Sequence, residues 1–193
     1  ERRFMKMKKM WILSLLLCCL LLSTSVFAYN PIGGKFSRGV SNTCYYVDST
    51  ASAYTTRINA AANNWVNTGH GWNPIYMTPV SSSYLTHMDF YGKTTSFWGD
   101  SNIRGETRMF TNSGQDITSK AHNTNWMYAE IYVNTSVVST NTIQTQGTFA
   151  HEMGHAFGLD HVSNVNALMH RYSNERLTHV VSLDEHNGIN ALY

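Results

Sequence analysis

Two histidines and a glutamate lie within one turn of a predicted helix, in a stretch that reads H-E-x-x-H-x-x-G-x-x-H from residue 151. Residues four apart share one face of an α-helix, so His151 and His155 can present two imidazoles to one metal ion. Gly158 comes where this helix must stop, because a residue without Cβ can take the left-handed conformation that turns the chain. That turn lets His161 return as a third ligand. Glu152 lies close enough to hold a water molecule and deprotonate it without being a ligand itself.

Three histidine ligands with one open coordination position are typical of a catalytic zinc ion, whereas a structural zinc ion is usually enclosed by four ligands. At the residue frequencies of this chain, the five fixed residues of the motif arise by chance in about one of 10⁴–10⁵ sequences of this length. The H-E-x-x-H core alone arises in roughly one per cent, so the extension carries most of the specificity. The alternative interpretation is a core helix with two histidines on one face, and the complete motif favours the zinc site.

The helix that presents these ligands is predicted to begin near Thr142. Phe149, Met153 and Ala156 recur at helical spacing opposite the two histidines, so we expect them to form the buried side of the helix. The residues expected to flank this side are Ala150 and Phe157. The ligands are therefore predicted to lie on a helix that is anchored in the core.

The chain before this helix predicts one further long helix among short strands. A strand is expected over Val40–Val47 and a helix over Ala51–Asn67, with N-cap candidates between them at Asp48, Ser49 and Thr50. The apolar residues at helical spacing in this helix are Tyr54, Ile58, Ala61, Ala62 and Trp65. Further strands are predicted at Ile75–Val80, His87–Tyr91 and Glu106–Thr111, and a clearer one at Glu130–Val133 within Ala129–Asn134. A last helix is predicted at Leu183–Tyr193, with Ser182 as its cap. This order of elements predicts an α/β domain.

Residues 1–28 resemble a secretory signal peptide. Lysines precede an apolar run, Trp11–Leu22, that is too short to span a membrane comfortably, and Ala28 ends a sequence suited to signal peptidase. Met5 or Met7 would be a suitable start residue, so residues 1–4 fit a reading frame extended too far upstream. The alternative is an uncleaved membrane anchor. Cleavage predicts a secreted, extracellular protein without membrane attachment, in which residues 29–193 form one domain with no linker or repeat to divide it.

Residues 29–193 carry nine of the fourteen Lys and Arg and eleven of the twelve Asp and Glu, which gives a formal charge of −2. This balance does not indicate nucleic acid or an anionic membrane as a partner. Cys44 is the one cysteine left after cleavage, so no intramolecular disulfide is expected, and we interpret it as a small buried apolar residue. A lone cysteine fits a bacterial secreted protein better than a disulfide-rich animal one. Nothing in the sequence demands more than a monomer.

Three features together resemble the metzincin zinc endopeptidases: the extended histidine motif, a Met-containing turn at Ala167-Leu168-Met169, and a closing helix that ends with Gly188–Tyr193. The chain is most similar to the matrixin branch, whose catalytic domains share the Ala-Leu-Met turn and a Gly-Ile-x-x-Leu-Tyr final helix. The resemblance is strong over residues 143–193, and over 40–135 only the order of elements agrees. It implies a twisted, mixed, mostly parallel five-stranded sheet, two long helices, a small C-terminal part, and the Met169 side chain beneath the zinc ion.

Some features of the family are missing or shifted. No cysteine-switch pro-segment precedes the first strand, and Cys44 does not match the switch sequence, so no built-in latency is expected. Arg171 occupies the position of an extra tyrosine ligand found in some metzincins, and we expect Tyr172 to be a surface or pocket-wall aromatic. No acidic cluster marks a calcium site, which leaves a calcium requirement open. The residues expected to be structural or solvated are His70, His87, His122, Asp160 and Asp184.

These residues predict zinc-dependent hydrolysis of a protein or peptide substrate, with Glu152 as general base that passes the proton to the leaving amine. By family position, the substrate would pair with the strand at Gly105–Thr111. The neighbours expected for the primary specificity pocket are Phe157, His170 and Tyr172. Two alternatives stay open: a zinc-binding adhesin or toxin-like module without hydrolytic activity, and an amidase that acts on cell-wall peptides. Glu152 argues against the first, because a pure metal site needs no carboxylate there.

Overall fold

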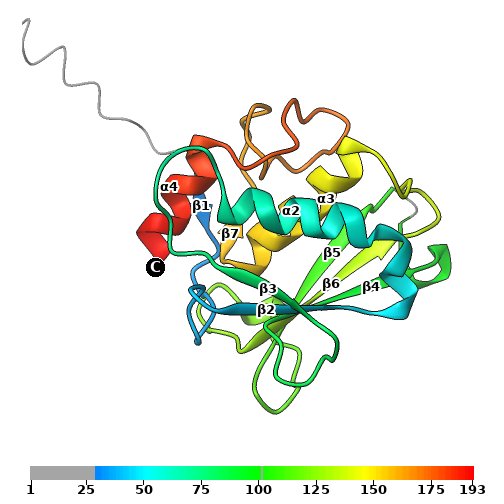
Figure 1. The fold of residues 1–193 in the computed structure, drawn as a ribbon, viewed down its shortest axis with the longest axis horizontal. Helices are drawn as coiled ribbons and strands as arrows, with labels where there is room; N and C mark the ends of the chain where they lie inside the picture. Colours follow the sequence, from blue (N-terminus) through cyan, green and yellow to red (C-terminus); the bar gives the residue numbers. More distant parts are fainter. Residues whose placement is uncertain (1–28, 101) are drawn as a thin grey trace, which may run out of the picture.

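One five-stranded sheet lies at the centre of the computed structural model, which describes residues 29–100 and 102–193 (Figure 1). Its strands are β2 (Thr43–Val47), β3 (Met77–Val80), β4 (Met88–Lys93), β5 (Gly105–Phe110) and β6 (Tyr128–Asn134). In space their order is β3-β2-β4-β6-β5, with β5 antiparallel to β6 and all other neighbours parallel. This confirms the predicted mixed, mostly parallel sheet. The predicted signal peptide, residues 1–28, lies outside the described residues.

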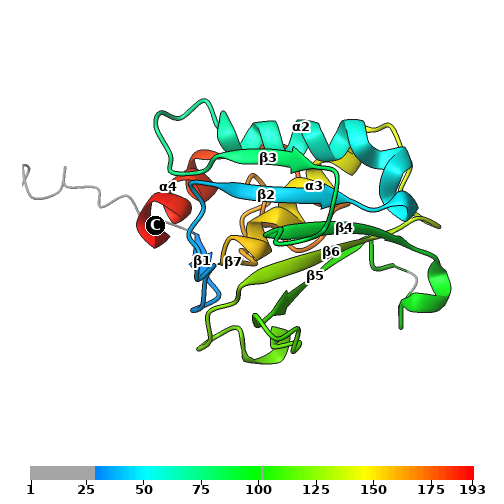
Figure 2. The same cartoon turned by 60° about the horizontal axis from the view of Figure 1, so that its bottom comes forward.

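Two long helices, α2 (Thr55–Val66) and α3 (Ile143–Ala156), lie side by side on one face of this sheet (Figures 1 and 2). The chain enters α2 through a 3-10 turn, η1 (Ser49–Tyr54), where the Asp48 carboxylate accepts a hydrogen bond of 2.8 Å from the Thr50 N–H. The apolar residues predicted for this helix are all buried: Tyr54, Ile58, Ala61, Ala62 and Trp65. The remaining 3-10 turns are η2 (Thr95–Phe97) and η3 (Thr118–Lys120).

Two buried tryptophans fix α3 in the core. The indole N–H of Trp65, on α2, donates a 2.9 Å hydrogen bond to the Ala150 carbonyl, and that of Trp126, before β6, donates one of the same length to the Ala156 carbonyl. The second bond satisfies one of the carbonyls that a helix leaves without an internal partner at its C-terminus. The residues predicted for the buried side of α3 and its flanks are fully buried: Phe149, Ala150, Met153, Ala156 and Phe157. The helix therefore has one fixed orientation over the sheet.

The C-terminal part is small and contains one helix. After α3 the chain forms β7 (Leu159–Asp160), which pairs antiparallel with β1 (Asn30–Pro31), and it ends with α4 (Leu183–Leu192) beside them (Figure 1). Ser182 caps α4 in a capping box, because its side chain accepts from the backbone of the first turn while Glu185 accepts a 2.9 Å hydrogen bond from the Ser182 N–H. The structure thus has the last helix and the cap that the sequence predicts.

The first strand corrects two predictions. β2 begins at Thr43 rather than at Val40, because residues 40–42 form a bend and a turn after Gly39, whose φ is +72°. Val40 is nevertheless buried, so its side chain packs in the core although it lies outside the strand. Cys44 is half-buried, not buried as predicted, and its backbone N–H donates to His87 Nδ1 at 3.2 Å.

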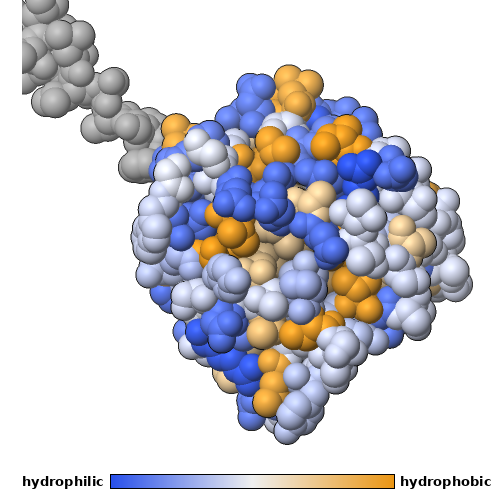
Figure 3. Space-filling view, viewed as in Figure 1, coloured by the Kyte–Doolittle hydropathy of each residue, from blue (hydrophilic) through white to orange (hydrophobic). Residues whose placement is uncertain are grey.

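The surface is mixed in character. On the face drawn in Figure 3, hydrophobic residues form separate patches among hydrophilic ones. Among the described residues, the most exposed large aromatic side chains are Trp72 and Tyr84, which flank β3 in sequence. Among residues 29–100 and 102–193, no helix has the length and apolar character needed to cross a membrane.

Candidate metal centre

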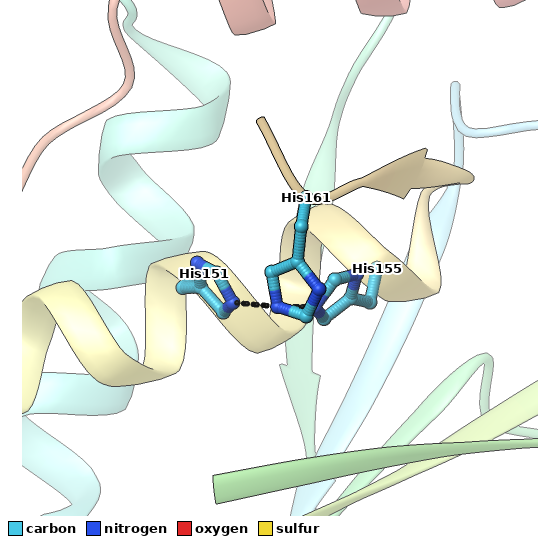
Figure 4. A group of neighbouring side chains, drawn as sticks. All are labelled: His151, His155 and His161. Carbon is cyan, nitrogen blue, oxygen red and sulfur yellow. Dashed lines mark hydrogen bonds between the residues drawn. The ribbon is translucent and has the colours of Figure 1, made fainter. Parts of the chain in front are cut away.

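Three histidine side chains converge at the C-terminal end of α3 (Figure 4). His151 and His155 come from one face of the helix, and His161 comes from the segment that follows β7. The Nε2 atom of His161 lies 3.2 Å from the Nε2 atoms of both other histidines. The three residues predicted as ligands are thus brought together.

The donor atoms fit a zinc ion. Nδ1 of His151 lies 2.8 Å from the Leu168 carbonyl oxygen, and Nδ1 of His155 lies 2.8 Å from that of Leu159. A carbonyl oxygen only accepts, so Nδ1 carries the proton and the Nε2 lone pair is left to face the shared centre. Zinc–nitrogen bonds of about 2.0–2.1 Å in a tetrahedral arrangement put the nitrogens about 3.3–3.4 Å apart, close to the separation found here. Burial lowers the pKa of all three histidines, to about 4 for His155, so the rings are neutral near pH 7.

A glycine makes the turn that returns the third histidine. Gly158 has a φ of +101°, and a Cβ added there would lie 3.0 Å from the Gly34 carbonyl oxygen, so both conformation and space favour glycine. Its N–H donates to the His155 carbonyl at 2.9 Å. Beyond the turn, the Asp160 carboxylate accepts a 2.7 Å hydrogen bond from the His161 N–H. These contacts fix the direction from which His161 approaches α3.

The Glu152 carboxylate is buried between α3 and the start of β5. Its Oε2 lies 2.8 Å from the Thr107 hydroxyl, which is also 2.9 Å from the Glu152 carbonyl oxygen and can donate to either. A Cβ added at Gly105 would lie 2.9 Å from Oε1, so the absence of a side chain there leaves room for the carboxylate. Burial raises the pKa of Glu152 to about 7, against the opposing effects of the Thr107 hydrogen bond and the Arg176 charge. The carboxyl group is thus poised for proton exchange near neutral pH.

Met169 packs beneath the turn of α3 that carries the ligands. It is buried, and a Cβ added at Gly154 would overlap its sulfur, so the glycine allows the two segments to approach. The Met169 N–H donates a 3.0 Å hydrogen bond to a Glu185 oxygen. The acid of the last helix that holds this turn is Glu185, one residue after the Asp184 named from the sequence. The Ser182–Glu185 capping box is the sequence signal that identifies it.

An open cleft runs past the histidines in two parts. The larger part has a volume of about 720 Å³ and the smaller about 330 Å³. The residues that line both are Gly105, Glu106, Glu152 and His161. Of the predicted pocket neighbours, Tyr172 lines the larger part. Phe157 is instead in the core against Trp65, and His170 is buried behind the cleft, with Nδ1 3.2 Å from the Tyr172 carbonyl oxygen.

Sequence reasoning missed the part that three residues play in the site. Arg176 was not named, and Gly105 and Thr107 were named only within the Gly105–Thr111 strand expected to bind the substrate. Thr107 is 45 positions from Glu152, which it contacts, and nothing local in a strand marks such a threonine. Arg176 is buried, and one of its guanidinium nitrogens, Nη1, donates to the Leu168 carbonyl at 3.2 Å. Its only signal is an arginine shortly after the Met-containing turn.

Comparison with known proteins supports the same assignment. A scan against models of protein families matches one described as Matrixin over residues 72–193, which is 122 of the 193 residues. The matched range contains the three histidines, Glu152 and the whole of β5. A search of curated proteins finds no significant match.

Proposed function

Since the chain belongs to the matrixin family and is a zinc metalloendopeptidase, we propose that Glu152 is its general base and that residues 29–193 are its secreted catalytic domain. The observation that carries this proposal is the buried carboxylate of Glu152 beside three histidines whose free Nε2 atoms face one another at the edge of an open cleft. A site that only held a metal ion would gain nothing from burying a carboxylate there, because desolvation of that group costs free energy.

Each residue of the centre has one task in the reaction. His151, His155 and His161 hold zinc, which supplies Lewis acidity that polarises a carbonyl group and acidifies water towards neutral pH. Glu152 takes the proton from water and gives it to the leaving amine. Thr107 orients the Glu152 carboxylate by a hydrogen bond to one oxygen, which leaves the other free to face the reacting atoms. Met169 is a hydrophobic base for the ligands, and Gly158 positions His161.

The substrate is a protein segment that binds in an extended conformation along β5. β5 is the edge strand of the sheet and pairs with β6. At its far end the outer side is also occupied, because Phe110 bridges Asp116 and the Ile117 N–H donates to the Met109 carbonyl, whereas Gly105 and Glu106 at its start line both parts of the cleft. An edge strand offers backbone N–H and C=O groups that can pair with a further strand. Backbone pairing along β5 brings the scissile bond next to Glu152, because Gly105 and Glu152 are neighbours.

Export follows from the same assignment. Matrixins are typically secreted, and residues 1–28 have the lysines, short apolar run and small residue at Ala28 of a signal peptide. Tyr29, the residue after the proposed cleavage site, packs against the core, and β1 begins at Asn30. Cleavage after Ala28 therefore leaves the described fold intact. The mature enzyme acts as a monomer, since one chain supplies all the residues of the site.

Metal content and hydrolysis measured together test this function. We expect one zinc ion per chain in the purified mature protein, hydrolysis of casein, loss of hydrolysis with a chelator and recovery with added zinc. Zinc without hydrolysis of any peptide would favour the binding module, and no zinc would contradict the metal site. Parallel incubation with peptidoglycan separates the amidase, which would release cell-wall peptides and leave casein intact.

A further inference from the structure

Arg176 is a buried cation with two unused hydrogen-bond donors. Its side chain is 5% exposed, and its Nε and Nη2 atoms have no hydrogen-bond partner among the described residues. Among the described residues, the one hydrogen bond of its side chain is from Nη1 to the Leu168 carbonyl. A buried charge without such partners is costly, so its retention calls for a partner that the protein itself does not supply.

The unused donors lie on one edge of the guanidinium group. Nε–H and one N–H of Nη2 point in the same direction and form a fork that matches the two oxygens of a carboxylate. The nearby carboxylates of Glu152 and Glu185 attract Arg176 by charge, but neither accepts a hydrogen bond from its Nε or Nη2. Glu152 accepts from Thr107, and Glu185 accepts from Met169 and Ser182. The fork is therefore left for an anionic group from outside the chain.

Arg176 lines the larger part of the cleft, next to the metal centre. The walls of this part are the segment before β5, the segment after Met169, and the face of α3 with Thr148, His151 and Glu152. Two more arginines, Arg104 and Arg171, line the same space, and the Nε atom of Arg104 is also buried without a partner among the described residues. Two surface carboxylates line this space as well, but Asp100 accepts from Asn102 and Glu106 pairs with Arg108. A substrate side chain that enters beside the scissile bond thus meets three guanidinium groups.

We propose that this pocket selects an acidic side chain, with Arg176 as the specificity-determining residue and Arg104 as a second contributor. The inference rests on the proposed peptidase function and names its substrate class: proteins with a glutamate or aspartate at the position that occupies this pocket. The carboxylate receives a bidentate pair of charge-assisted hydrogen bonds from Nε and Nη2 of Arg176. Because Arg176 is buried in the wall of the pocket, the pair forms in surroundings of low dielectric constant, where it is stronger than in water.

A structural role for Arg176 uses a different part of the side chain. Nη1 donates to the Leu168 carbonyl, which also accepts from Nδ1 of the zinc ligand His151. That contact gives Arg176 a structural role behind the ligand His151. It does not explain why Nε and Nη2, on the other edge of the guanidinium group, have no partner. Loss of the structural contact would weaken cleavage of all substrates equally, whereas loss of the fork would remove the preference for an acidic residue. The two roles are therefore separable by kinetics.

The test compares peptides that differ at one position. The cleaved position is first mapped with a mixed peptide library and mass spectrometry. kcat/KM is then measured for matched peptides with Glu, Gln or Leu on each side of the scissile bond. We expect the Glu peptide to exceed the Gln peptide roughly 10- to 100-fold at one of these positions, the range for two hydrogen bonds to a charged group. A ratio near one at every position would overturn the proposal without touching the peptidase function, since the Leu peptide would still be cleaved.

Variants identify the residue responsible. Arg176→Met should bring the Glu-to-Gln ratio close to one, Arg176→Lys should retain part of the preference, and Arg104→Met should lower it less than Arg176→Met does. The matched control is Arg57→Met, since Arg57 is a half-buried arginine on α2 that contacts Asn141 and does not line the cleft. If Arg176→Met does not fold, the ratio in Arg176→Lys and Arg104→Met decides. An unchanged ratio in these variants would contradict the assignment, and failure to cleave any peptide, Leu included, would instead count against the peptidase function.

Discussion

Glu152 and Asp89 are both buried carboxyl groups whose pKa is raised by burial. Glu152 lies beside the metal centre, whereas Asp89 lies in the sheet away from it. Glu152 is on α3 beside the cleft, with a pKa of about 7. Asp89 is on β4 with a pKa of about 6, and it faces away from the helices, because its neighbour Phe90 packs its ring against Phe149 of α3. One carboxyl group adjoins three histidines and the other adjoins Glu130 of the neighbouring strand.

The hydrogen-bond partners of the two carboxyl groups explain why the pKa of each is raised. The Thr107 hydroxyl is 2.8 Å from Oε2 of Glu152, and the Thr86 hydroxyl donates to Oδ1 of Asp89 at 2.6 Å. One hydroxyl does not replace the water that a carboxylate loses on burial, so both groups bind a proton more readily than in water. Next to a metal centre and a cleft, that readiness serves proton transfer. In the sheet, the raised pKa of Asp89 has no catalytic role, and the ionised carboxylate only makes the folded protein less stable.

The largest effect is expected when the carboxylate beside the cleft becomes an amide. Glu152→Gln should lower kcat/KM by about 10²–10⁴-fold, because an amide cannot accept the proton from water. The zinc content should stay at one per chain, since Glu152 is not a ligand. The measurements are peptide hydrolysis and metal analysis of the same preparation.

The matched control for this variant is Glu130→Gln, the same change on the other face of the sheet. Glu130 accepts a hydrogen bond from the Tyr132 hydroxyl and lies next to Asp89 in the sheet, so its loss should leave kcat/KM unchanged. Hydrolysis by Glu152→Gln at the wild-type rate would show that another group is the base. Loss of zinc from this variant would show instead that the carboxylate holds the metal.

A smaller effect is expected from the hydroxyl that orients Glu152. Thr107→Val keeps the shape of the side chain and removes the hydrogen bond to Oε2, so kcat/KM should fall about tenfold, mainly in kcat. Thr107→Ser keeps the hydroxyl and should restore most of the activity. If the serine variant is as slow as the valine variant, packing of the methyl group against α3 matters and the hydrogen bond does not. The comparison of the two variants therefore tests whether Thr107 positions Glu152 through its hydroxyl.

How much of this site the sequence reveals depends on the distance between the partners along the chain. The histidine motif, its stop at Gly158 and the cap at Thr142 are local, and α3 forms where they predict, from Ile143 to Ala156. Periodicity likewise finds α2, although its first turn is the 3-10 turn η1, which no simple pattern distinguishes from α-helix. Local signals thus suffice for the ligands and for the elements that carry them.

The contacts that complete the site come from residues outside the histidine motif. Thr107 meets Glu152 across the space between β5 and α3, and Arg176 reaches Leu168 from a segment without periodicity. The half-buried state of Cys44 also depends on tertiary neighbours, since an apolar residue in a strand alternates between faces whose cover the sequence does not specify. What could not be predicted is therefore the set of contacts that β5 and the segment after Met169 make around the ligands.

The smallest effect is expected at Asp89, and it has the opposite sign. The folded pKa, about 6, is above the ordinary value of 3.8, so the folded state binds the proton more tightly than the unfolded chain. Stability from this group is complete below pH 4 and is lost as the pH rises through 6. Asp89→Asn cannot ionise and still accepts from Thr86, so at pH 8 it should be more stable by about 1 kcal/mol, or roughly 2–4 °C in Tm, after allowance for solvent screening.

The advantage of Asp89→Asn should disappear at pH 4, which thermal unfolding at the two pH values measures. Asp48→Asn is the matched control, because hydrogen bonds from Thr50 lower the pKa of Asp48 and its ionised form already stabilises the fold. An equal gain in both variants would trace the effect to net charge. A loss of stability in Asp89→Asn at pH 8 would mean that the ionised Asp89 is stabilised in the sheet. The contrast with Glu152 would then include the surroundings as well as the position, because only Asp89 would be stabilised in its ionised form.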